Sequence, residues 1–97
     1  MPIYITLYNL TEKGVKNIKD APKRIEEGIK AAESTGGKLL GFYATMGEYD
    51  YISIGEGPSD EVYMTFLLGL GIQGYVRTKT LKGFTNEEFG KMIANLP

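Results

Sequence analysis

The alternation of apolar and polar residues along the chain predicts four β-strands. In residues 3–8 an aliphatic side chain stands at every odd position and a tyrosine or threonine at every even one, a period of two that is typical of a strand. Strand-like segments follow at residues 39–45, 49–56 and 74–84. Only Met46-Gly47-Glu48 separates the second from the third, so these two should form a hairpin.

A helical pattern fills the interval between the first and second strands. Its apolar stripe has a 3.6-residue spacing and keeps its phase through the proline: Val15, Ile18, Pro22, Ile25, Ile29 and Ala32. We therefore expect one long helix that is kinked or interrupted near residues 20–22. Thr11 and Asp20 are its candidate N-caps, and Gly36-Gly37 should end it.

The second helix should be of a different kind, because residues 62–71 are almost wholly apolar. A helix with no polar face is expected to be buried on most sides, which a domain of this size can barely achieve alone. Contacts with a partner chain are therefore expected. Near the end of the sequence, Thr85 followed by Glu88 is a capping-box pattern that predicts a short C-terminal helix.

The order of these elements predicts the fold. Strand, helix, strand, strand, helix, strand is the ferredoxin-like βαββαβ arrangement of the α+β class. We expect residues 1–97 to form a single domain, with a four-stranded antiparallel sheet, two helices on one face and a C-terminal helix.

Composition narrows the function. The net charge of −1 provides no strong field for nucleic acid or an anionic membrane, so neither is expected as a partner. The chain has no cysteine and no histidine, which excludes disulfides and removes the commonest metal ligand and general base. No apolar run is long enough to span a bilayer and the N-terminus does not resemble a signal peptide. We expect a cytoplasmic protein with no cofactor and no metal.

The predicted topology leaves one face of the sheet uncovered. If the most apolar face packs against the helices, the odd positions of the first strand, with Ile52 and Ile54, point inward. The open face then carries tyrosines of the first and third strands with a fourth-strand arginine: Tyr4, Tyr8, Tyr49, Tyr51 and Arg77. The orientation of the second strand stays open, because Leu40 and Phe42 compete with Leu39 and Tyr43 for the inner face.

A sheet face rich in tyrosine suits another surface better than water. Face-to-face stacking of two copies would form a dimeric α/β barrel, and a ligand pocket in or beside that interface is compatible with it. RNA stacking on the aromatic residues is a third hypothesis, but the third strand lacks the aromatic RNA-binding pattern.

Asp50 is the one carboxylate in an unexpected place, because strands accept aspartate poorly. By alternation it should point with Ile52 toward the helices, where a carboxylate must be paired or hydrogen-bonded. Two hypotheses remain: Asp50 accepts backbone hydrogen bonds that fasten the hairpin, or it serves as a polar anchor or base in a pocket.

The segments GKLLGFYATMGEYDYISIGEGPSDE and TKTLKGFT, with Gly14 and Arg24 in an earlier matching segment, resemble the GYD-domain family. The Gly-x-Tyr-Asp signature is Gly47-Glu48-Tyr49-Asp50. This resemblance implies a ferredoxin-like fold that assembles as a dimeric α/β barrel, without an established reaction. GEYDYISI and GYVRTKT are also similar, more distantly, to the ligand-sensing domains of leucine-responsive (Lrp/AsnC-type) regulators, which implies small-molecule binding at subunit interfaces.

The function expected from the sequence is binding or sensing of a small metabolite by a homo-oligomer, at least a dimer, at or near its interface. The candidate ligand-binding residues are Tyr4, Tyr8, Tyr49, Asp50, Tyr51 and Arg77. The alternatives are a cofactor-independent monooxygenase or isomerase-like enzyme, and a structural assembly unit without a ligand.

Overall fold

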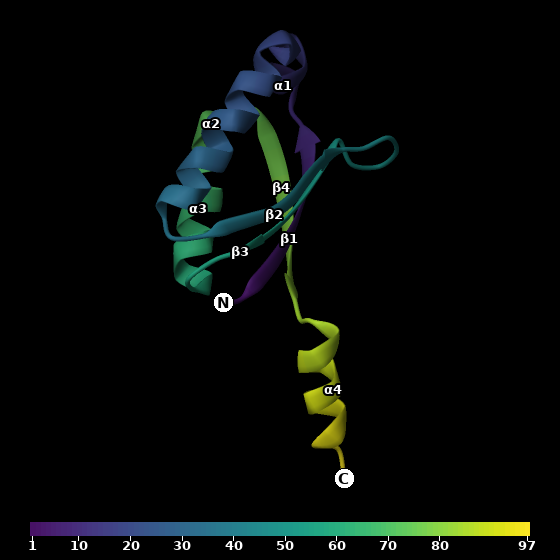
Figure 1. The fold of residues 1–97 in the computed structure, drawn as a ribbon. Helices are drawn as coiled ribbons and strands as arrows, with labels where there is room; N and C mark the ends of the chain where they lie inside the picture. Colours follow the sequence, from purple (N-terminus) through teal and green to yellow (C-terminus); the bar gives the residue numbers. More distant parts are fainter.

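The computed structural model describes residues 1–97 and confirms the predicted order of elements. The elements are β1 (Ile3–Leu10), α1 (Glu12–Lys16), a 3₁₀ turn (Ile18–Asp20), α2 (Ala21–Ser34), β2 (Lys38–Ala44), β3 (Tyr51–Glu56), α3 (Asp60–Gln73), β4 (Val76–Gly83) and α4 (Asn86–Ala94). The four strands form one antiparallel sheet in the order β2-β3-β1-β4. Helices α2 and α3 lie on the same side of this sheet (Figure 1).

The expected long helix is divided into two helices. Thr11 caps α1 as predicted, because its side chain accepts a hydrogen bond from the backbone N–H of Gly14. The chain leaves the α-helix at Asn17, makes the 3₁₀ turn, and re-enters a helix at Ala21 with Pro22 in the first turn. Asp20 stands at the N-cap position of α2, but its side chain makes no capping hydrogen bond. Asp20 therefore marks the start of α2, as predicted, without capping it through its side chain.

The assignment of the two sheet faces was wrong. Tyr4, Thr6 and Tyr8 of β1 and Tyr51 and Ser53 of β3 are buried, and they lie on the side of the helices. The aliphatic positions between them, such as Ile5 and Ile54, lie on the uncovered face and are only half-buried.

The physical reason for this inversion is that α3 supplies partners for the hydroxyl groups on the inner face. The hydroxyls of Thr6 and Tyr63 are 2.6 Å apart, and the rings of Tyr4 and Tyr63 stack with their centroids 4.2 Å apart. The hydroxyl of Tyr4 donates a 2.6 Å hydrogen bond to Asp60 in the first turn of α3. A tyrosine satisfied in this way packs its ring in a core as an aliphatic residue would.

The register of the edge strands completes the two faces. Arg77, Lys79 and Leu81 of β4 pair with odd positions of β1 and so share the uncovered face. In β2 an irregularity between Leu39 and Gly41 breaks the alternation. The sequence left the orientation of β2 open for this reason, because an extra residue in a strand changes the parity of the positions beyond it.

Helix α3 is longer than the predicted segment and is not buried on most sides within one chain. Met64, Leu68 and Ile72, which are spaced along one side of the helix, are 57%, 58% and 87% exposed. The structure has no helix with the length and apolar character needed to cross a membrane.

Helix α4 projects from the end of β4 away from the sheet and the other helices (Figure 1). The predicted capping box is present, with hydrogen bonds in both directions between Thr85 and Glu88. No hydrogen bond or ion pair joins α4 to the rest of the domain. Its apolar side is exposed to solvent, at Phe89, Met92, Ile93 and Leu96.

Candidate functional site

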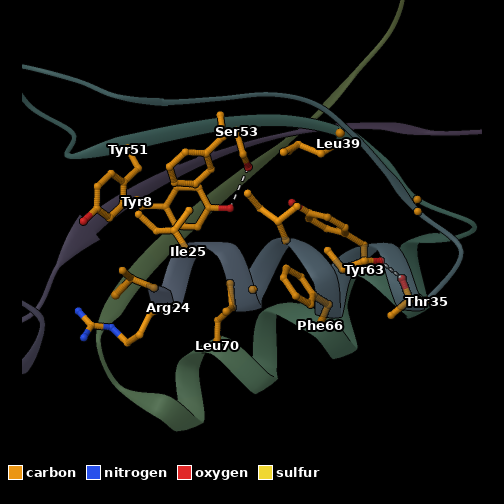
Figure 2. Close-up of a pocket in the computed structure, with 18 of the residues that line it drawn as sticks. Tyr8, Arg24, Ile25, Thr35, Leu39, Tyr51, Ser53, Tyr63, Phe66 and Leu70 are labelled. Carbon is orange, nitrogen blue, oxygen red and sulfur yellow. Dashed lines mark hydrogen bonds between the residues drawn. The ribbon is translucent and has the colours of Figure 1, made fainter. Parts of the chain in front are cut away.

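A cavity of about 120 Å³ lies between the sheet and helices α2 and α3 (Figure 2). Of the 26 residues that line it, 15 are hydrophobic, so its walls are mainly apolar. Helix α2 contributes Ile25 and Ile29, and α3 contributes Phe66 and Leu70. All of the residues that line the cavity belong to a single chain.

A pair of buried hydroxyl groups lies on the sheet side of this cavity. The hydroxyl oxygen of Tyr8 is 2.8 Å from Oγ of Ser53, and both residues are more than nine-tenths buried. Neither hydroxyl has another hydrogen-bond partner in the protein. Burial raises the pKa of Tyr8 to about 12, although the hydrogen bond with Ser53 acts in the opposite direction. Tyr8 is therefore a neutral phenol at physiological pH.

Aromatic rings surround the hydroxyl pair. The ring centroids of Tyr8, Phe42 and Tyr51 form a triangle with sides of 5.5 to 6.2 Å, the spacing of tilted and edge-to-face pairs. On the helix side the rings of Tyr63 and Phe66 are 6.0 Å apart. These rings give the cavity broad flat walls.

Arg24 contributes mainly its stem to the cavity. Its Nη1 donates a 2.9 Å hydrogen bond to the backbone carbonyl of Asn17, and its guanidinium lies 4.1 Å from the ring centroid of Tyr75. Figure 2 shows the guanidinium at the edge of the cavity, directed away from the Tyr8–Ser53 pair. Arg24 therefore forms part of the rim and places no charge at the centre.

A second hollow, of about 460 Å³, lies between α2 and α3 and shares residues with the cavity, including Gly28, Phe66 and Leu70. A Cβ atom added at Gly28 or Gly69 would meet no other atom within 4 Å. The hollow therefore adjoins the cavity on the outer side of α2 and α3.

The predicted site residues are divided between three places. Tyr8 and Tyr51 line the cavity. Tyr4 is buried behind Tyr63 and binds Asp60. Tyr49 lies before β3, with Nζ of Lys79 5.8 Å from its ring centroid, and Arg77 lies exposed on the uncovered sheet face.

Asp50 lies outside the cavity and joins the ends of three strands. Its Oδ2 accepts a 2.7 Å hydrogen bond from the backbone N–H of Leu10, and its own N–H donates to the carbonyl of Tyr8. Its carbonyl accepts from the N–H of Thr45 at the end of β2. These contacts are of the kind expected for a residue that fastens the hairpin.

Asp60 links the beginning of α3 to β1 and β4. Besides accepting from Tyr4, its Oδ1 lies 3.0 Å from Nζ of Lys82. The hydrogen bond from Tyr4 and then that from Lys82 hold the pKa of Asp60 below its usual value. Burial, followed by the bond to Asp60, raises the pKa of Tyr4 to about 12. This network positions the helix that forms one wall of the cavity.

Ser53, Phe42 and the α3 residues of the cavity were not among the predicted site residues. The helical stripe that contains Ile25 and Ile29 did identify the side of α2 that faces the sheet. Ser53 was missed because the inverted face assignment placed it with solvent. Nowhere does the structure gather three or more acidic, histidine or cysteine residues that could hold a metal ion.

Comparisons with known proteins agree with this fold. A family model described as the GYD domain matches residues 4–93. The "glutamine synthetase and cystathionine beta-lyase binding protein" of Thermus thermophilus is 31% identical over 83 residues, which are 84% of this chain and 87% of that protein.

Among solved structures, the Mycobacterium tuberculosis leucine response regulatory protein LrpA superposes with a TM-score of 0.64 at 18% identity. The superposition covers 88% of this chain and 51% of that one, so this chain spans about half the length of the regulator. This likeness shows that the two proteins share a fold.

Proposed function

Because this chain belongs to the GYD domain family, we propose that it is a binding domain whose small-molecule ligand occupies the cavity between the sheet and helices α2 and α3. The observation that carries the proposal is an apolar cavity with a buried hydroxyl pair, Tyr8 and Ser53, in its wall. Small-molecule sites commonly combine apolar walls with a few placed polar groups. The proposed site lies within one chain, whereas the sequence led us to expect an interface.

The cavity supports binding better than acid–base catalysis. Glu56 is the only carboxylate among its lining residues. Tyr8, with a pKa of about 12, keeps its proton at neutral pH and is suited to donating a hydrogen bond. A cofactor-independent oxygenase or isomerase would need a group that accepts a proton from its substrate, so we rank that alternative below binding.

Two adjacent alanines of α2 offer a matched test of the site. Ala32 lines the cavity, whereas Ala31 lines only the outer hollow. In ligand-observed NMR with a mixture of small metabolites, Ala32→Leu should fill the cavity and abolish binding, and Ala31→Leu should leave it unchanged. Equal binding by the two variants would place the ligand elsewhere.

We also propose that two copies associate through the uncovered face of the sheet. Aliphatic side chains dominate the centre of this face, and in a single chain none of them is fully buried. They are Ile3, Ile5, Leu7, Ile52, Ile54 and Leu81. Stacking two such faces would bury the aliphatic residues of both copies and form a dimeric α/β barrel.

Sedimentation velocity tests this association. Leu81→Asp places a charge on the uncovered face and should convert the dimer to a monomer. Ile72→Asp places the same charge on the outer side of α3, at a residue that is 87% exposed, and should leave the dimer intact. A wild-type protein that is monomeric at micromolar concentration would contradict the proposal.

Binding of another protein is the second candidate function, and helix α4 favours it. An exposed apolar helix side is a typical docking element, and the Thermus thermophilus relative is named for binding two enzymes. Glutamine synthetase from the same source as this chain is a suitable probe. Co-elution should be lost on Phe89→Ser and retained on Asn95→Ser, a substitution at the exposed C-cap residue of the same helix.

A further inference from the structure

The polar groups at the centre of the cavity are hydroxyls, and this limits the chemistry of what can bind there. Building on the function proposed above, we propose that the ligand is a compact, uncharged molecule about the size of a substituted benzene ring. It carries one hydroxyl or carbonyl oxygen, which binds the Tyr8–Ser53 pair. The cavity volume, the placement of charge and the count of hydroxyl hydrogens each support this class.

The volume sets the size of the ligand. An engineered apolar cavity of about 150 Å³ is known to bind benzene, and the cavity here is about 120 Å³. A single six-membered ring fills this space, with its oxygen substituent directed at the hydroxyl pair. The rings of Phe42, Tyr51, Tyr63 and Phe66 provide flat surfaces for packing against a ring.

The placement of charge excludes an ionic group from the centre. The lining residues with charge are Arg24, Lys38 and Glu56, and the guanidinium of Arg24 is engaged by Asn17 and Tyr75. A carboxylate or ammonium group beside Tyr8 would lose its hydration without gaining a counter-ion, which is costly. Burial raises the pKa of Tyr8 because it disfavours the charged phenolate, and it would disfavour a charged ligand group for the same reason.

The hydroxyl pair has one hydrogen to spare. Tyr8 and Ser53 together carry two O–H hydrogens, and their mutual hydrogen bond uses one of them. Neither oxygen has another partner in the protein, so one buried O–H and several lone pairs remain for a ligand. A ketone, aldehyde or phenol can satisfy that O–H, whereas a hydrocarbon leaves it unpaired.

The experiment compares five probes of similar size: toluene, p-cresol, benzaldehyde, benzoate and benzylamine. Dissociation constants for the wild-type protein are measured by NMR titration. We expect p-cresol and benzaldehyde to bind about 3- to 10-fold more tightly than toluene, the value of one net hydrogen bond. Benzoate and benzylamine should bind more weakly than toluene.

Two variants show whether the hydroxyl pair causes the preference. In Tyr8→Phe/Ser53→Ala both hydroxyls are removed together, and p-cresol should bind no better than toluene. Tyr43→Phe removes a tyrosine hydroxyl at an exposed residue of β2 that does not line the cavity, and the preference should persist.

The outcomes separate this inference from the function on which it rests. If toluene binds as tightly as p-cresol to the wild-type protein, or benzoate binds most tightly, the ligand class is wrong while binding in the cavity stands. If no probe binds the wild-type protein, or if Ala32→Leu binds the neutral rings unchanged, the inference and the proposed cavity site both fail.

Discussion

Substitution of Gly14 by alanine should destabilise the protein, although alanine is the better helix former. Gly14 is buried in α1, where the backbone of the chain after α3 passes directly over it. An added Cβ would lie closer to the carbonyl oxygen of Tyr75 than real Cβ atoms approach, and 2.9 Å from Cδ2 of Leu10. The obstacle is backbone, so relief requires moving α1 away from the start of β4.

The carbonyl of Tyr75, which would have to move, is already a hydrogen-bond acceptor. It accepts a 3.0 Å hydrogen bond from the backbone N–H of Thr11, the cap of α1. Overpacking of a core typically costs about 1–3 kcal/mol, and the strained hydrogen bond adds about 1 kcal/mol. The higher helix propensity of alanine stabilises the variant by about 1 kcal/mol. The net free energy of unfolding should therefore fall by about 1–3 kcal/mol.

Gly28→Ala provides the matched control, because it makes the same change in α2 where the added Cβ meets nothing within 4 Å. That variant should gain about 0.5–1 kcal/mol from helix propensity alone. Urea unfolding followed by circular dichroism measures the free energy of unfolding of both variants. In thermal unfolding, a domain of this size shifts its Tm by about 4–8 °C per kcal/mol. If Gly14→Ala proves as stable as Gly28→Ala, the steric argument is refuted.

Three further predictions concern hydrogen bonds and titration. Tyr8→Phe and Ser53→Ala should each lower the free energy of unfolding by about 1–3 kcal/mol, because each leaves a buried hydroxyl unpaired, and the double variant should cost less than the sum in a double-mutant cycle. Asp50→Ala should lose about 1–3 kcal/mol through the unpaired N–H of Leu10 without changing affinity for the neutral ring probes; lost affinity at unchanged stability would contradict this. Because the pKa values of Tyr4 and Tyr8 are raised to about 12 in the folded protein, their stabilising contribution should be complete below pH 10 and lost as the pH rises toward 12. Absorbance titration at 295 nm should show these two phenols ionising last, and a single transition near pH 10 for all tyrosines would refute it.

The order and type of the elements could be predicted because they depend on periodicity, which is local. The capping positions of Thr11 and of the Thr85–Glu88 pair were predictable for the same reason, since the bonded groups are three residues apart. The sequence predicted an interruption of the first helix near residues 20–22, whereas α1 ends at Lys16. The apolar stripe keeps its phase across the 3₁₀ turn, so it does not mark the earlier break.

The direction in which each sheet face points was not predictable from alternation. Alternation separates Tyr4, Thr6 and Tyr8 from their neighbours but does not say which set faces the helices. That choice depends on contacts such as the one between Thr6 and Tyr63, which are 57 residues apart in sequence. The cavity could not be predicted for the same reason, because the expected orientation placed Ser53 and the tyrosines on the uncovered face of the sheet.

The almost uniform apolarity of α3 has a consequence for how the site can evolve. Apolar residues lie both toward the cavity, as at Phe66, and away from it, as at Leu68. Hydrophobic burial alone therefore does not determine the rotation of the helix about its axis. Hydrogen bonds at its two ends do so instead.

At the first turn, Asp60 accepts hydrogen bonds from Tyr4 of β1 and Lys82 of β4, and the hydroxyl of Tyr63 is hydrogen-bonded to that of Thr6. At the last turn, the side chains of Thr11 and Lys13 donate to the carbonyls of Gly74 and Gln73. The middle of α3 makes no such hydrogen bonds to other elements. The side chains there can change size while the helix keeps its place, so the lining of the proposed cavity can diverge without redesign of the scaffold.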